Sequence, residues 1–208
     1  MKIVVFGATG GTGRLIVEQA LALDHDVTAF VRDPARMNIQ HPNLRLVQGD
    51  ILDPTAMTQA TQGQDAVLCA LGMPLMNKDG LRAAGTRNII DAMQACHVRR
   101  LICLSSFGVG DSYAFLPISY RYLVAPLVLR HVLADHERQE TYIRDSDLDW
   151  TIVRPANLTD GPATGVYLQG IQRPNRRLKM KVSRADVAAY MLEQLDDVHL
   201  RQAPYISY

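Results

Sequence analysis

The stretch that decides the fold is FGATGGTG, residues 6–13, which follows an apolar run at residues 2–6 and opens a helical pattern at residues 11–23. Four glycines fall within the seven residues 7–13. Glycine weakens both helices and strands, so this concentration needs a local reason. Either the backbone turns very tightly here, or a bound molecule approaches it too closely for a Cβ atom.

The glycines have the spacing Gly7-x-x-Gly10-x-x-Gly13 between a predicted strand and a predicted helix. In that setting Gly7 permits a tight turn, Gly10 permits close approach of a pyrophosphate, and Gly13 permits close packing of the helix on the strand. The helix N-terminus then stabilises the charge of the phosphates. A glycine-rich turn without a ligand is the alternative. The residues expected to contact a dinucleotide here are Gly7, Thr9, Gly10, Gly11, Thr12 and Gly13.

Strand-like apolar runs alternate with helical patterns along the whole chain. The predicted strands are residues 2–6, 27–31, 44–48, 66–70, 100–104 and 150–153, and the predicted helices are residues 11–23, 80–96, 135–145 and 184–195. Continuously apolar strands that alternate with helices are typical of a parallel sheet covered on both faces. We therefore expect a single α/β domain over residues 1–208, a Rossmann-type doubly wound parallel sheet with helices on both faces.

Two segments fall outside this alternation, residues 107–132 and 155–181. The first is apolar and rich in tyrosine, with Pro117 and Pro126 as interruptions, whereas the second is rich in glycine, proline and arginine. Both follow the carboxyl ends of late strands, which is where an open α/β sheet binds its ligands. They are predicted to form an acceptor pocket. The simpler alternative is that each is a covering loop with its own small core.

The end of the second strand indicates which dinucleotide is bound. Proteins that prefer NAD usually place an acidic residue there, but this chain has Arg32, followed by Asp33 and Arg36. Two guanidinium groups could clamp a 2′-phosphate, which predicts a preference for NADPH/NADP+ over NADH. In the alternative, Asp33 pairs with an arginine on a solvated surface. Further cofactor contacts are expected where the third and fourth strands end, at Asp50, Ile51, Leu71 and Gly72.

The composition narrows the class of protein. The chain has a formal net charge of +1 and no basic block interleaved with aromatics, which argues against a nucleic-acid partner. No stretch approaches the length of a membrane span and no secretory signal is recognisable, so we expect no membrane partner and a cytoplasmic location. The three cysteines form no Cys-x-x-Cys pair and are read as core residues in a reducing compartment. A monomer without a metal site is expected.

These motifs give the chain a resemblance to the atypical short-chain dehydrogenase/reductase superfamily of NAD(P)-binding, NmrA-like proteins. Within it, the chain most resembles the biliverdin-IXβ reductase / NADPH-dependent flavin reductase group. Beyond the glycine and arginine motifs, the resemblance rests on Asp135-His136-x-Arg138, Asp160-Gly161-Pro162-x-Thr164-Gly165 and Ser183-Arg184-Ala185-Asp186-Val187. The superfamily's usual Tyr-x-x-x-Lys pair is missing, since no lysine lies between Lys78 and Lys179. A tyrosine–lysine carbonyl reductase or epimerase is therefore disfavoured.

The resemblance implies an NADPH-dependent reductase that transfers hydride from nicotinamide C4 to a flat conjugated small molecule. The expected acceptor is a flavin such as FMN or riboflavin, bound as a substrate rather than as a tightly held cofactor, or a biliverdin-like tetrapyrrole. Solvent can supply the proton, so positioning would provide most of the catalysis. Ser106 and His136 are the expected catalytic residues, through a hydrogen bond to the acceptor or a proton relay. The acceptor is expected to contact Phe107, Asn157 and Leu158, and the cofactor Ser105 and Pro155.

Alternatives remain open for the residues and for the function. His136 could be a surface or helix-capping histidine, and Ser106 could be a strand-end hydroxyl that caps the next turn. The protein could be an NmrA-like redox sensor that binds the dinucleotide without turnover, or a quinone or enone reductase with the same kind of pocket. The basic stretch at residues 173–181 could attract an anionic acceptor, or it could be an ordinary solvated loop.

Overall fold

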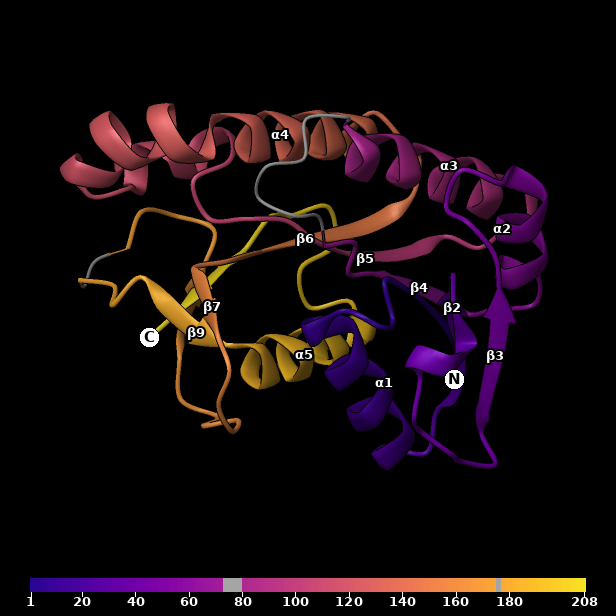
Figure 1. The fold of residues 1–208 in the computed structure, drawn as a ribbon. Helices are drawn as coiled ribbons and strands as arrows, with labels where there is room; N and C mark the ends of the chain where they lie inside the picture. Colours follow the sequence, from indigo (N-terminus) through magenta and orange to yellow (C-terminus); the bar gives the residue numbers. More distant parts are fainter. Residues whose placement is uncertain (73–79, 175–176) are drawn as a thin grey trace.

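The computed structural model of the chain describes residues 1–72, 80–174 and 177–208. Its centre is a sheet of eight strands in the order β3-β2-β1-β4-β5-β6-β10-β8 (Figure 1). Neighbouring strands pair in parallel, except that β8 runs antiparallel to β10. The strands of this sheet are β1 (Lys2–Phe6), β2 (Asp26–Val31), β3 (Leu44–Gln48), β4 (Ala66–Cys69), β5 (Arg100–Leu104), β6 (Asp149–Pro155), β8 (Leu168–Gly170) and β10 (Tyr205–Ser207). A separate parallel pair is formed by β7 (Asn157–Thr159) and β9 (Lys181–Ser183).

The strand order reverses beside β1. From β1 the chain builds outward to β2 and β3, and it then returns to place β4 on the other side of β1. Phe6 at the end of β1 pairs in register with Phe30 of β2 and with Cys69 of β4. The loops that follow these three strands therefore begin at one edge of the sheet. Open α/β sheets bind their ligands at such a reversal, outside the carboxyl ends of the strands.

Helices cover both faces of the sheet (Figure 1). On one face α1 (Gly11–Ala22) packs against α5 (Arg184–Glu193), and on the other α3 (Leu81–Ala95) packs against α2 (Pro54–Thr61) and α4 (Arg130–Arg144). Successive residues of β1 alternate between the two layers, with Val5 in the core beneath α1 and α5 and Val4 in the core beneath α2, α3 and α4. This alternation follows from the period of two in a strand. The expected doubly wound sheet is confirmed.

The structure departs from the sequence-based prediction in several elements. The sequence patterns predict neither α2 nor β10, and they start α4 at residue 135 instead of Arg130. Residues 107–132, predicted to lie outside the regular elements, contain a 3₁₀ helix at Gly110–Phe115 and a π-helix at Tyr120–Leu129 that continues into α4. Pro126 lies inside the π-helix. Proline usually breaks an α-helix because it lacks an N–H group, and the wider π-helical turn accommodates it.

One further expectation needs correction, and it concerns the cysteines. Cys69 and Cys103 are buried, but Cys96 is only half-buried at the end of α3, so the reading of all three as core residues is wrong for Cys96. Helix ends face solvent more often than strand centres, and this accounts for the difference. Among the described residues, no helix combines the length and the apolar character that crossing a membrane requires.

Candidate functional site

The glycine-rich loop joins the carboxyl end of β1 to the N-terminus of α1. Gly7 has a φ of +81°, and a Cβ atom there would lie 2.4 Å from the carbonyl oxygen of Ala70. A Cβ atom on Gly13 would lie 2.1 Å from the carbonyl oxygen of Gly7. Both distances are far inside van der Waals contact. The tight turn and the close packing of α1 on the sheet therefore require glycine at these two positions.

The N-terminus of α1 has the properties of an anion site. Gly10 is extended and exposed, and within the described structure no side chain caps the helix and no acidic residue lies in its first turn. The first N–H groups of the helix are therefore free to bind an anion, and the helix dipole favours one. Thr12 in the first turn is buried. The pyrophosphate of a dinucleotide fits this end of α1.

Arg32 and Arg36 lie beyond the end of β2, and Arg36 closes a short 3₁₀ helix, Pro34–Arg36. Asp33 does not neutralise them, because its carboxylate accepts the backbone N–H of Ala35 at 3.0 Å and caps that helix. Both arginines are exposed, and neither forms an ion pair with any residue in the described parts of the chain. Two cations are thus available at the edge where the sequence predicts a 2′-phosphate.

The other predicted cofactor residues near this edge differ in exposure. The exposed Asp50 accepts the backbone N–H two residues further on at 2.9 Å, which forms a turn. Ile51 and Leu71 are buried, so their side chains mainly pack the core beneath α3. Gly72 is exposed, and a Cβ atom there would meet no atom of the described residues within 4 Å. Bare backbone at Gly72 and the carboxylate of Asp50 therefore remain open to a ligand.

A pocket of about 360 Å³ lies at the carboxyl ends of β5 and β6. It brings together seven residues predicted from the sequence, namely Ser105, Ser106, Phe107, His136, Pro155, Asn157 and Leu158. The rest of the lining comes mostly from the two segments, residues 107–132 and 155–181, that the sequence predicts to form such a pocket, although the sequence named none of these residues as a ligand contact. It consists of Leu116, Tyr120, Ala125, Leu129, Leu133, Ala156, Met180 and Arg184, of which Leu133 and Arg184 lie outside the two segments. Most of these side chains are apolar. Apolar walls combined with a set of polar groups are typical of pockets for small organic molecules.

His136 lines this pocket from α4, yet its side chain is buried. Its Nδ1 lies 2.9 Å from Oε1 of Gln139, whose amide nitrogen donates to the hydroxyl of Thr86 at 2.9 Å. Because Oε1 can only accept, Nδ1 carries the proton and Nε2 remains an acceptor. Burial, helped by the charge of Arg82, lowers the pKa of His136 from 6.5 to about 3, although the hydrogen bond with Gln139 opposes this. His136 is therefore a neutral, buried imidazole, and its reading as a surface histidine is wrong.

Asp135, the residue next to His136, joins α4 to the start of α3. Its carboxylate pairs with Arg82 at 3.0 Å and accepts the backbone N–H of Ala83 at 3.2 Å, and both side chains of the pair are buried. Arg82 also donates to the carbonyl oxygen of Leu71 at 3.2 Å. These bonds fix the end of β4 relative to the helix that carries His136.

The two serines that end β5 use their hydroxyls differently. Ser105 is buried and donates to Oε1 of Glu140 at 2.6 Å. Ser106 is half-buried, and its hydroxyl has only a long contact of 3.3 Å with the carbonyl oxygen of Phe107 among the described residues. The hydroxyl of Ser106 is thus the one available to a ligand in the pocket.

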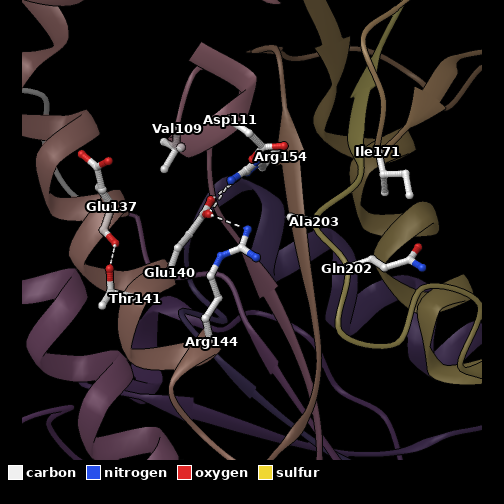
Figure 2. Close-up of a pocket in the computed structure, with 11 residues that line it drawn as sticks. Val109, Asp111, Glu137, Glu140, Thr141, Arg144, Arg154, Ile171, Gln202 and Ala203 are labelled. Carbon is white, nitrogen blue, oxygen red and sulfur yellow. Dashed lines mark hydrogen bonds and ion pairs between the residues drawn. The ribbon is translucent and has the colours of Figure 1, made fainter. Parts of the chain in front are cut away.

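Glu140 belongs to a buried ion-pair cluster in a second pocket, of about 520 Å³ (Figure 2). Arg154 donates to both carboxylate oxygens of Glu140, at 2.9 and 2.6 Å, and to Asp111 at 2.6 Å. Although burial lowers the pKa of Arg154, the hydrogen bonds and charge of Glu140 raise it above its ordinary value. Arg144 also points at Glu140, at 3.4 Å. Only Glu140 and Arg154 are buried, whereas Asp111 and Arg144 reach the surface. The buried charges pair with each other, so the cluster supports the junction of α4, β5 and β6.

Asp186 connects two of the motifs on which the resemblance rests. Its buried carboxylate accepts hydrogen bonds from the backbone N–H groups of Thr164 at 2.8 Å and Gly165 at 2.9 Å, and from the hydroxyls of Ser183 at 3.0 Å and Tyr208. Burial alone would raise its pKa, but these bonds, with that of Tyr208 foremost, lower it. The carboxylate thereby ties the loop before β8 to the start of α5.

Two pocket residues outside the predicted set make polar contacts there. The hydroxyl of Tyr120 accepts a hydrogen bond from Nδ2 of Asn157 at 2.9 Å, which links the π-helix to β7. Arg184 pairs with Asp160 at 2.6 Å, and its Cδ and Nε lie 2.9 Å from where a Cβ atom on Gly11 would be. Arg184 thus connects the acceptor pocket with the glycine loop. Its place in a shared motif was the only signal in the sequence that pointed to it.

The fold and the loop define a Rossmann-type protein with a dinucleotide site. A family model described as NAD(P)H-binding matches residues 7–198, and the chain belongs to this NAD(P)H-binding family. The sequence-based resemblance to NAD(P)-binding atypical short-chain dehydrogenases/reductases is thereby confirmed.

Three similar proteins illustrate the range of the family. The structure of ChuY, an anaerobilin reductase from Escherichia coli O157:H7, is 25% identical in sequence with a TM-score of 0.80, and the match covers 100% of this chain and 97% of that one. The (4-alkanoyl-5-oxo-2,5-dihydrofuran-3-yl)methyl phosphate reductase of Streptomyces griseus is 30% identical over 82% of this chain and 54% of its own length. An uncharacterised chloroplastic protein of Arabidopsis thaliana is 32% identical over 79% of this chain, which spans 61% of that relative. Reductases therefore occur among its relatives.

Proposed function

We propose that this chain is an NADPH-dependent reductase whose acceptor is a flat conjugated molecule, either a flavin or a biliverdin-like tetrapyrrole. The observation that carries the proposal is the pocket of about 360 Å³ at the ends of β5 and β6, in which apolar walls are combined with six polar side chains. Arg184 lines that pocket and also contacts the glycine loop, so the two sites adjoin. The anaerobilin reductase and the furanone phosphate reductase among the similar proteins support the reaction class.

The residues at the sheet edge fit the cofactor. The uncapped N-terminus of α1 would hold the pyrophosphate, with Gly10 giving close access to the backbone. Arg32 and Arg36 would hold the 2′-phosphate, which NADH lacks. When bound, NADPH would supply the hydride, and these residues would hold the cofactor beside the acceptor pocket.

The pocket residues suit positioning better than acid catalysis. The described lining contains no carboxyl group, and its histidine is neutral because the pKa of His136 is lowered to about 3. Ser106 offers a hydroxyl donor, and Nε2 of His136 offers an acceptor, for polar atoms of the bound ring system. In this proposal the walls exclude water from the reacting face, and the proton comes from solvent at its edge.

An acceptor screen tests the proposal directly. Purified protein is mixed with NADPH, and the absorbance of the reduced nicotinamide is followed with FMN, riboflavin, biliverdin and a small quinone in parallel. Turnover of a flavin or tetrapyrrole supports the reductase. Turnover of the quinone alone would move the acceptor to that class. Tight NADPH binding with no acceptor reduced would instead favour a redox sensor.

Cofactor preference is tested with an arginine variant and a matched control. Replacement of both cations in Arg32→Ala/Arg36→Ala should raise the KM for NADPH by roughly tenfold or more, because two charge-assisted bonds to the 2′-phosphate are lost. The KM for NADH should hardly change, since NADH has no such phosphate. The control Arg45→Ala removes an exposed arginine on the edge strand β3 and should leave both values unaltered. An equal loss with both cofactors would refute the clamp.

The roles of Ser106 and His136 are tested by the double replacement Ser106→Ala/His136→Ala. Loss of both polar groups should lower kcat with the best acceptor by more than about twofold while NADPH binding persists. A smaller loss would exclude both residues from the chemistry. Thermal unfolding of the variant shows whether the fold is retained.

A further inference from the structure

The segment that includes the π-helix presents an apolar surface that nothing in the described structure covers. Ile118, Tyr122 and Leu127 are 77%, 71% and 69% exposed, and Leu123 and Val128 are also more than half exposed. They lie within eleven consecutive residues, so they form one patch instead of a scatter of single side chains. We call these five residues the apolar patch. Its helix extends past the end of the sheet, at the upper left of Figure 1.

The opposite side of the same helix is packed against the protein. Ala125 is buried in a small core with Phe107, Leu116 and Tyr205. The π-helix is therefore apolar on both sides, a pattern that is normal for a helix with a second apolar environment. Contiguous exposed patches of this kind mark interaction sites in soluble proteins.

Cations adjoin the apolar patch. A groove beside it is lined by Ile118 of the patch, by its neighbours in the chain and by the irregular segment that leads into β9. Its lining contains five basic residues and, among the described residues, no acidic one: Arg121, Arg173, Arg177, Lys179 and Lys181. Arg176, which belongs to the same basic stretch, lies outside the described residues. The apolar patch is therefore bordered by positive charge, and we call these five basic residues its basic rim.

We propose that the apolar patch and its basic rim dock the protein onto the surface of an anionic lipid bilayer. A bilayer surface supplies both complements together, since its hydrocarbon buries apolar side chains and its anionic headgroups attract Lys and Arg. Tyr122 suits the interface, where an amphipathic ring is favoured. A second copy of the chain fits less well, because a two-fold contact would bring the same cations against each other. This proposal departs from the expectation from the sequence that no membrane is a partner, and it implies no membrane span.

Docking in this orientation would place the acceptor pocket near the lipid. Tyr120, Ala125 and Leu129 of the π-helix line that pocket with the side opposite to the apolar patch. The bound protein would therefore hold its pocket beside the surface in which apolar conjugated molecules dissolve. The docking itself does not depend on the proposed reaction, and the two are tested separately.

The test is flotation of the full chain with vesicles of pure phosphatidylcholine and with vesicles in which part of the lipid is phosphatidylglycerol. We expect binding to the anionic vesicles that falls steeply as the salt concentration rises, since screening weakens the rim. The variant Leu123→Asp/Leu127→Asp should lower the bound fraction at least roughly tenfold. The charge variant Lys179→Glu/Lys181→Glu should abolish the preference for anionic lipid.

A matched control separates docking from general changes in charge. Leu23→Asp/Val198→Asp replaces two other apolar residues, each 60% exposed compared with 59% for Leu123, and adds the same charge far from the patch. This control should bind vesicles like the wild type. Failure of the wild type to float with anionic vesicles at low salt, or equal losses in both variants, would overturn the proposal. The proposal would also be overturned if the wild type did not bind vesicles but dimerised in a concentration-dependent way, and if Leu123→Asp/Leu127→Asp abolished that dimerisation. NADPH binding, measured by fluorescence, reports separately on the cofactor site.

Discussion

The lowered pKa of His136 makes the stability of the protein depend on pH in a defined window. The native protein keeps this imidazole neutral down to about pH 3, whereas the unfolded chain protonates it near the ordinary value of 6.5. Between these values the unfolded state binds more protons, so stability falls as the pH falls. Above the ordinary pKa the residue is neutral in both states and has no such effect. From pH 7 to pH 5, uptake of this one proton by the unfolded chain costs roughly 2 kcal/mol.

The variant His136→Gln isolates this contribution, because an amide can still bond to Gln139 but does not titrate. Urea unfolding at pH 7 and pH 5 gives the free energy of unfolding of wild type and variant. On going from pH 7 to pH 5, the free energy of unfolding of the variant should rise by roughly 2 kcal/mol relative to that of the wild type. For a domain of this size, this corresponds to a relative change in Tm of roughly 4–8 °C. The control His41→Gln removes an exposed histidine and should preserve the wild-type pH response. If the difference between His136→Gln and wild type is the same at both pH values, the reasoning about burial is wrong.

Three further variants test the contacts around the site, each by urea or thermal unfolding. Gly13→Ala would place a Cβ atom 2.1 Å from a backbone carbonyl oxygen and should destabilise the fold by several times the effect of Gly161→Ala, where no atom in the described part of the chain lies within 4 Å. Glu140→Gln should cost about 3–5 kcal/mol, because it leaves the buried Arg154 with a weakened partner; a cost below about 1 kcal/mol would contradict the role given to the pair. Asp186→Asn should cost about 1–3 kcal/mol, since an amide cannot accept all the donors that converge on the carboxylate, and an unchanged Tm would refute this.

The sequence predicted the fold where local chemistry leaves little choice. The glycine spacing implied a strand, a tight turn and a helix, and the structure shows that Gly7 and Gly13 tolerate no Cβ atom. The alternation of apolar runs predicted the parallel sheet because fully buried strands need apolar side chains on both faces. Arg32 and Arg36 were also predicted from the sequence. Once the end of the second strand is located, the residues that follow it can be read directly from the chain. Elements with weak patterns escaped, as α2 and β10 did, because the eight residues of Pro54–Thr61 and the three of Tyr205–Ser207 are too short for a clear periodicity.

Part of the acceptor pocket was predictable from the order of the strands and not from local sterics. Ser106 and Asn157 follow the ends of β5 and β6, so the topology of the sheet already brings them together. The sequence also assigned the segment that contains the π-helix to this pocket, but which of its residues face the pocket, and that Arg184 joins them, depend on how distant segments fold back over that edge. The sequence by itself determined the sheet, the dinucleotide loop and the cations beside it, because these follow from short-range sterics and periodicity. Only the tertiary structure decided that His136 is neutral, that Glu140 accepts a hydrogen bond from the hydroxyl of Ser105, and that none of the described residues covers the apolar patch. Burial and partner choice depend on which surfaces the folded chain brings into contact.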